Sequence, residues 1–171
     1  MVLTGKVDFF EAKRLVRDCD IVHSLVEPLA FLGSLIKGNR PFFITAHGTY
    51  AVEPLDKLCS SGLKLRYAYK KADAVVCVSH FTESEIKKRA TGINTVVMNN
   101  GGAFDKFQKS DIARPAILGN RTPIIFSVGA LKFRKGFHIS ISAVVKIKEL
   151  FPNFLYIISG DQSDEQYYAE L

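Results

Sequence analysis

The sequence has no long hydrophobic run and few cysteines, and each shortage excludes a class of protein. Its longest nearly apolar stretch, residues 28–36, is about half of the roughly 18 residues that a membrane-spanning helix requires. The N-terminal segment has acidic side chains and no apolar core, unlike a secretory signal. Three cysteines without a CxxC pair are typical neither of a disulfide scaffold nor of a structural zinc site. We therefore expect a cytoplasmic protein with reduced thiols.

Aromatic and aliphatic residues are plentiful. The 171 residues include 13 Phe and 6 Tyr, and 47% are hydrophobic, so the chain is not intrinsically disordered. The formal net charge is +6. This charge favours anionic partners such as phosphate esters, an acidic membrane surface or nucleic acid, and it is equally compatible with a solubility charge alone.

Short β-rich runs alternate with helical patterns along the chain. Strands are expected at 20–25, 41–46, 74–79, 95–98, 123–128 and 154–159. Helices are expected at 9–17, 27–36, 54–71, 82–89, 136–150 and from 164 onward. Several strands are nearly continuous apolar runs, a pattern typical of strands buried on both faces of a parallel sheet. The alternation predicts an α/β fold built from βαβ units.

Two of the expected helices carry more detailed signals. Thr82 and Glu85 have the spacing of a capping box, which predicts that a helix begins at Thr82. In the helix at 136–150, five apolar side chains share one stripe at helical spacing and predict its buried face. They are Phe137, Ile141, Val144, Val145 and Ile147.

The polar stretch 104–121 interrupts the alternation and is expected to be a linker. The sequence thus predicts a first domain at 1–103 and the start of a second at 122–171. Two strands and one complete helix do not close a core by themselves, so the second domain is expected to be truncated. We expect the chain to be part of a larger two-domain enzyme.

Small and polar residues follow most of the strands. Ligands gather at the carboxyl ends of the strands in an open parallel sheet, so these positions are candidates for a cleft. Gly and Asn also end strands in ordinary turns, and each position alone fits either role. The candidates are His47, Thr49, Ser79, His80, Asn99, Asn100, Gly101, Gly129, Gly160 and Asp161.

The most informative segment is VGALKFRKG at 128–136, where a strand runs into a basic loop and then a helix. Lys132, Arg134 and Lys135 supply charge, and the glycines allow close backbone approach. The helix start adds backbone N–H donors and a positive dipole end. This combination predicts a diphosphate site, although it matches neither a Walker A loop nor GxGxxG. A solvated basic loop is the alternative.

Five ordered segments carry a family resemblance. They are AHGT (46–49), ADAVVCVSHFTESEIKK (72–88), MNNGGAFDKF (98–107), IIFSVGALKFRKGFHISISAV (124–144) and LYIISGD (155–161), with DIVHSL (20–25) upstream. In order and spacing the chain resembles family 4 glycosyltransferases of the GT-B fold. The resemblance implies two Rossmann-like domains, with the nucleotide sugar mainly on the C-terminal one and the acceptor on the N-terminal one. It implies no metal and no further cofactor.

The resemblance also assigns roles to residues. His47 would contact the donor sugar, while Gly129 and Lys135 would hold the donor diphosphate and stabilise the leaving group. Ala130 stands where many relatives have Arg, so Arg134 or Lys132 would substitute. Asn100-Gly101 matches an interdomain motif and Gly160-Asp161 a turn, and Thr49 and Ser79 would line the cleft.

The resemblance thus implies a piece of a glycosyltransferase, retaining as in the family, that transfers a sugar from a nucleotide-diphosphate sugar to a glycan or lipid-linked acceptor. The family's glycine-rich N-terminal loop is missing and its paired glutamates would lie beyond Leu171, so the chain alone is expected to be inactive. The alternatives are a non-catalytic relative and a GT-B nucleotide-sugar epimerase. The basic segment 9–17 indicates peripheral contact with the inner face of the membrane. The sequence shows no contiguous basic face of the kind that binds nucleic acid.

The other candidates are expected to be structural. His23, His80 and His138 lack metal-ligand spacing, and His23 is expected to be a packed or hydrogen-bonded core histidine. Cys77 is expected to be buried in its strand. The mixed basic and aromatic run 64–71 predicts a solvated helix with two core tyrosines rather than a membrane or nucleic-acid surface.

Overall fold

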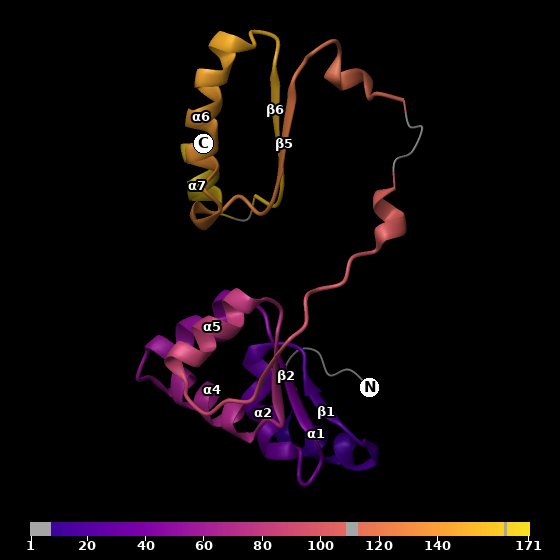
Figure 1. Cartoon of the computed structure of the whole chain (residues 1–171), viewed down its shortest axis with the longest axis vertical. Coiled ribbons are helices and arrows are strands. Elements are labelled where there is room, and N and C mark those ends of the chain that lie inside the picture. Colours follow the sequence, from indigo (N-terminus) through magenta and orange to yellow (C-terminus); the bar gives the residue numbers. More distant parts are fainter. Residues whose placement is uncertain (1–7, 109–112, 163) are drawn as a thin grey trace. The chain divides into compact units, whose positions relative to one another are not determined.

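The computed structural model describes residues 8–108, 113–162 and 164–171. Its contacts divide the chain into two compact units, Met1–Lys106 and Phe107–Leu171. Figure 1 draws the first in indigo to magenta and the second in orange to yellow. The short 3-10 turns Phe104–Phe107 and Ala116–Leu118 lie within the stretch expected to be a linker.

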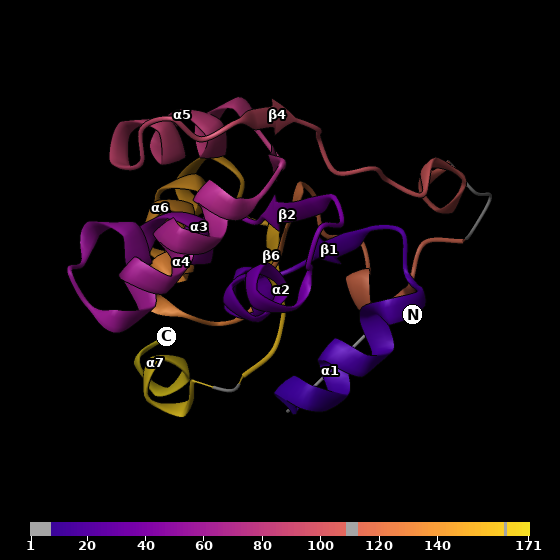
Figure 2. The ribbon, with the colours of Figure 1, turned by 90° about the horizontal axis from the view of Figure 1, so that it is seen from below.

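The first unit is built on a parallel sheet with the strand order β1-β2-β3-β4. These strands are β1 (Val22–Ser24), β2 (Phe42–Ala46), β3 (Ala74–Cys77) and β4 (Thr95–Val97). Its helices are α1 (Phe9–Leu15), α2 (Ala30–Ile36), α3 (Thr49–Val52), α4 (Ser60–Lys71) and α5 (His80–Arg89), with 3-10 turns η1 (Val16–Asp18), η2 (Glu27–Leu29) and η3 (Glu53–Asp56). Helix α1 lies at the β1 edge of this sheet and α5 at the β4 edge (Figure 2).

One face of this sheet forms the main core. Phe42 and Ile44 of β2 and Val75 and Cys77 of β3 are fully buried there, against residues such as Tyr69 of α4. At the alternate positions Ala74 is buried, but Phe43, Thr45, Val76 and Val96 are half-buried or exposed. The expectation of burial on both faces is therefore wrong for the described part of this unit, because its helices pack on one side.

The second unit contains two parallel strands, β5 (Ile124–Val128) and β6 (Leu155–Ser159), joined through α6 (Phe137–Leu150). The 3-10 turn η6 (Phe133–Lys135) precedes α6, and α7 (Glu165–Glu170) follows β6. A small cluster of Leu131, Phe137 and Tyr167 is buried. On α6, Ile141, Val144 and Ile147 are half-buried, but Val145 is 63% exposed. Val145 was wrongly placed on the buried stripe, since it lies about 100° around the helix from Val144.

The predicted α/β class with parallel, Rossmann-like sheets is confirmed, and all six predicted strands are present with slightly shorter ends. The start of α5 was predicted wrongly. Ser79, in an extended conformation, accepts the Thr82 N–H at 3.1 Å, so the helix begins at His80 and Thr82 is buried inside its first turn. The expected helix at 54–71 is divided by an extended Lys57 into η3 and α4.

Three smaller expectations were tested as well. Burial of Cys77 is confirmed. His23 is not a packed core residue, because it lies on the edge strand β1 and its Nε2 is 2.8 Å from Thr45 Oγ1 at an exposed position. Of the two tyrosines in α4, Tyr69 is buried and Tyr67 is 43% exposed, since Tyr67 lies about 160° around the helix from Tyr69.

Candidate functional site

The carboxyl end of β2 turns directly into α3 through His47 and Gly48. Gly48 has a φ of 64°, a left-handed conformation that favours glycine, and this allows the abrupt change from strand to helix. The backbone N–H of His47 donates to the carboxylate of Glu27, while the His47 and Thr49 side chains are exposed. The strand end thus fixes the His47 backbone and leaves its imidazole accessible.

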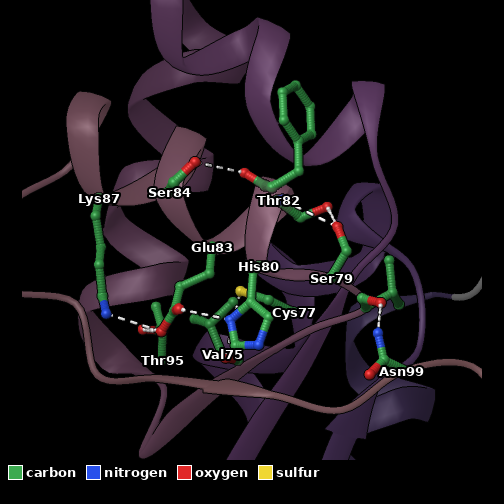
Figure 3. Close-up of polar contacts among 12 residues, drawn as sticks. Val75, Cys77, Ser79, His80, Thr82, Glu83, Ser84, Lys87, Thr95 and Asn99 are labelled. Atoms are coloured by element: carbon green, nitrogen blue, oxygen red, sulfur yellow. Dashed lines mark hydrogen bonds and ion pairs between the residues drawn. The ribbon is translucent and has the colours of Figure 1, made fainter.

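The carboxyl end of β3 carries a helix cap and an exposed histidine (Figure 3). The Ser79 hydroxyl caps α5 and also lies 3.1 Å from Thr82 Oγ1. His80, the next residue, has a side chain that is 87% exposed, and its Nδ1 lies 3.8 Å from the Glu83 carboxylate. The Ser79 hydroxyl therefore stabilises the start of α5, whereas most of the His80 imidazole is exposed to solvent.

Glu83 lies at the centre of the contacts beside His80. Its carboxylate accepts hydrogen bonds from Lys87 Nζ at 2.8 Å and Thr95 Oγ1 at 2.7 Å (Figure 3). These hydrogen bonds, together with the charge of Lys87, lower the pKa of Glu83. The carboxylate consequently stays ionised at neutral pH and ties α5 to β4.

The carboxyl end of β4 is tied to β3 by Asn99, whose side-chain amide donates to the Val78 carbonyl at 3.2 Å. Asn100 and Gly101 follow and are exposed. A Cβ added to Gly101 would meet nothing within 4 Å. His47, Ser79 and Asn100 thus follow three adjacent strands at the same edge of one sheet, as the sequence predicted from strand order alone.

In the second unit, Gly129, Lys135 and Gly160 come together beyond the ends of β5 and β6. The ladder continues past both strands, because Gly129 N–H donates to Ser159 O at 2.9 Å and Leu131 N–H donates to Asp161 O at 2.8 Å. A Cβ on Gly160 would lie 1.7 Å from the Gly129 carbonyl oxygen. The Lys135 stem lies 3.9 Å from where a Cβ of Gly129 would be. Close backbone approach therefore explains the glycine at 160.

The three predicted cations follow Gly129 in a single turn. Lys135 N–H donates to Lys132 O at 2.8 Å, which closes η6 around Arg134. All three side chains are exposed, and among the described residues none of them forms an ion pair. Gly136, with a φ of 69°, then caps α6. The result is a concentrated positive charge at a helix N-terminus.

Part of this helix N-terminus is already occupied. The backbone N–H of His138 donates to the Tyr167 hydroxyl at 3.1 Å, and His138 Nδ1 lies 2.8 Å from the same oxygen. The Phe133 ring stacks on the imidazole with centroids 4.7 Å apart. One of the N–H donors that the sequence assigned to an anion is therefore held by Tyr167.

Glu27 and the pair His138–Tyr167 were missed by sequence reasoning. Glu27 had one usable signal, because it is the sole charged residue in the segment 25–36. The pair had none, since its members are far apart in the sequence and meet only through tertiary packing.

Within 8–108, 113–162 and 164–171, no group of three His, Cys, Asp or Glu side chains could hold a metal ion. None of the helices described there is both long and apolar enough to cross a bilayer.

Two family models match the chain, one after the other. The model for Glycosyltransferase Family 4 matches residues 6–101, and the model for Glycosyl transferases group 1 matches residues 108–171. No curated protein matches the chain. The second match implies a nucleotide-sugar donor and an acceptor. Since the first model alone covers more than half of the sequence, the chain belongs to glycosyltransferase family 4.

Proposed function

We propose that the basic turn of the second unit binds the diphosphate of a nucleotide sugar, whose sugar is passed with retention to a glycan or lipid-linked acceptor. The observation that carries this proposal is the arrangement of Lys132, Arg134 and Lys135 in η6, exposed and beside Gly129. Three cations at the start of a helix form an electrostatic site for two phosphate groups.

The three cations have different chemistry. Lys135 folds its stem toward Gly129, so its ammonium is the candidate for the phosphate nearest the backbone, where charge develops on the leaving group. Arg134 offers a planar fork suited to bidentate phosphate contact. Because the N–H of His138 already donates to Tyr167, the helix N-terminus offers one donor fewer, and we assign the main role in binding to the side-chain cations.

His47 is proposed to orient the donor sugar. This role rests on the resemblance of AHGT to the family motif and on the exposed position of its imidazole. The hydrogen bond from the His47 N–H to Glu27 supports the proposal, because it holds the backbone from which the imidazole extends. Thr49, Asn100 and Gly101 are proposed to contact the substrates from the strand ends of the first unit, and Asp161 from the strand ends of the second.

The donor site is tested by calorimetry with UDP and GDP on the wild-type chain, Lys135→Ala and Lys148→Ala. Lys148 is an exposed lysine in the last turn of α6 and serves as the matched control. A hydrogen bond to a charged group contributes about 1.5–3 kcal/mol, so Lys135→Ala should weaken binding by about tenfold or more. Lys148→Ala should leave the affinity unchanged. Equal affinities for the two variants would refute the assignment.

A peripheral membrane contact is proposed for α1 and the turn that follows it. Phe10, Lys13, Arg14 and Arg17 are exposed and spaced so that they share one side of this segment. Each basic residue near an anionic surface contributes about 1 kcal/mol. Replacing Lys13 and Arg14 by Ala should reduce cosedimentation with phosphatidylserine vesicles, whereas replacing Lys70 and Lys71 should not. Equal cosedimentation of both variants would refute the contact.

A further inference from the structure

A pocket of about 240 Å³ lies within the first unit. Its lining comes from η2, α2, α3, η3 and α4: Glu27, Pro28, Phe31, Tyr50, Pro54, Ser61, Lys64 and Leu65. Glu27 closely follows β1 and Tyr50 closely follows β2, so the pocket adjoins the carboxyl edge of the sheet, where parallel sheets bind ligands. Its volume is below that of sites for drug-sized molecules and suits one ring-sized group.

The walls of the pocket are mostly apolar and partly preformed. The Phe31 ring packs edge-to-face against Tyr67, with ring centroids 5.9 Å apart. The Lys64 ammonium lies 5.6 Å from the centroid of the Phe31 ring. Tyr50 is 72% exposed although its ring lines the pocket. Two aromatic side chains in the lining, one exposed and one held in place, favour a ligand group with an apolar C–H face.

Three polar side chains line the pocket, those of Glu27, Ser61 and Lys64, and the Glu27 carboxylate is the acceptor among them that carries a negative charge. Glu27 is only 7% exposed, and one of its oxygens accepts the His47 N–H. The second oxygen has no hydrogen-bond partner among the described residues. Every fully buried side-chain nitrogen or oxygen there has a partner, so this oxygen is not fully buried, and it belongs to a residue that lines the pocket. The nearby Tyr69 hydroxyl donates to Ala51 O at 3.0 Å instead. Burial and the Glu27 charge raise the pKa of Tyr69.

We propose that this pocket binds one sugar ring of the acceptor, with the C–H face of the ring on Tyr50 and a ring hydroxyl donating to Glu27. The inference rests on the proposed function, since it names the acceptor chemistry of the same reaction. A neutral polyol satisfies the buried carboxylate, whereas a cationic ligand would be opposed by Lys64 at the pocket wall. The contact from Glu27 to the His47 N–H links the position of this ring to the residue proposed to orient the donor.

Saturation-transfer NMR with methyl glycosides of glucose, galactose, mannose and N-acetylglucosamine tests the pocket on the whole chain. Glu27→Gln keeps the shape of the side chain and removes its charge. We expect it to weaken binding of the favoured glycoside about tenfold or more. Tyr50→Ala should weaken it about two- to tenfold through loss of stacking. The controls Glu149→Gln and Tyr168→Ala, both exposed in the other unit, should bind like the wild-type chain.

Two further measurements make the outcomes decisive. The first compares octyl with methyl glycosides. Tighter binding of the octyl glycosides, with the same dependence on Glu27, would indicate that the sugar ring belongs to a lipid-linked saccharide. Equal affinities would indicate a free glycan. If Glu27→Gln unfolds, the exposed Tyr50→Ala carries the test. If no glycoside binds, or if neither variant weakens the binding, the proposal that this pocket holds an acceptor sugar is wrong. UDP and GDP binding through Lys135 is measured separately, so failure here is distinct from failure of the donor site.

Discussion

Replacement of Gly160 by Ala should disrupt the basic turn without touching a cation. The added Cβ would lie 1.7 Å from the Gly129 carbonyl oxygen, half of the 3.4 Å at which ordinary contact begins. It would also lie 2.6 Å from the Gly129 carbonyl carbon. Both neighbours are backbone atoms, so a side-chain rotation cannot relieve the clash and the two loops must separate.

The magnitude follows from what this separation breaks. The hydrogen bonds from Gly129 N–H to Ser159 O and from Leu131 N–H to Asp161 O join the two loops at 2.9 and 2.8 Å. Each contributes about 0.5–1.5 kcal/mol, and overpacking adds about 1–3 kcal/mol. We expect the second unit to lose roughly 2–6 kcal/mol of stability, a large share of the total for a domain.

Hydrogen exchange on the peptides that contain β5 and β6 measures this loss directly, with urea denaturation as a second readout. Gly101→Ala is the matched control, because its Cβ would meet nothing within 4 Å. Gly160→Ala should exchange faster in these peptides and should bind UDP and GDP less tightly, while Gly101→Ala should retain wild-type protection. Equal protection in the two variants would refute the close approach of the loops.

Three other changes test the first unit. Ser79→Ala removes the cap of α5 and should cost about 1 kcal/mol in urea denaturation, whereas Ser84→Ala, whose hydroxyl bonds only within the helix at Phe81 O, should cost less. Tyr69→Phe leaves the buried Ala51 carbonyl without its 3.0 Å hydrogen bond and should cost about 1–3 kcal/mol, while the exposed Tyr67→Phe should be near neutral; equal unfolding midpoints would contradict the buried contact. His23 is exposed by its accessible surface, but partial desolvation of its ring beside Thr45 lowers its pKa below the usual 6.5. The unfolded chain therefore binds this proton more readily, and stability should fall slightly as pH decreases below about 6.5. His23→Gln should flatten that part of the pH dependence of the urea midpoint, and an unchanged slope would contradict it.

Much of the fold could be predicted because strand and helix patterns are local. The six strands, their parallel class and the burial of Cys77 follow from short apolar runs separated by helical segments. The start of α5 could not be chosen from sequence, because Ser79 and Thr82 are both good caps and only the extended backbone of Ser79 decides. Val145 likewise matched an idealised stripe and lies outside the face that packs on the sheet.

The candidate site was predictable to the extent that it depends on strand ends. The basic turn and its proximity to Gly160 follow from segments that end adjacent parallel strands. Glu27 and Tyr167 act through contacts with His47 and His138, and neither pair shares a local pattern. Such tertiary hydrogen bonds decide which donors and acceptors remain open to a ligand, and so they set the chemistry of both units.

The most direct test of the donor site is an NMR titration of the ¹⁵N-labelled chain with UDP and GDP. Binding at the basic turn should shift the backbone amides of Gly129, Lys135, Gly136 and Phe137 first, and Lys135→Ala should require about tenfold or more nucleotide to reach the same shifts. Amides of β4 and α5, in the other unit, should change little. Saturable shifts that leave Gly129–Phe137 unmoved, or that follow the same titration curve in Lys135→Ala as in the wild-type chain, would contradict the account.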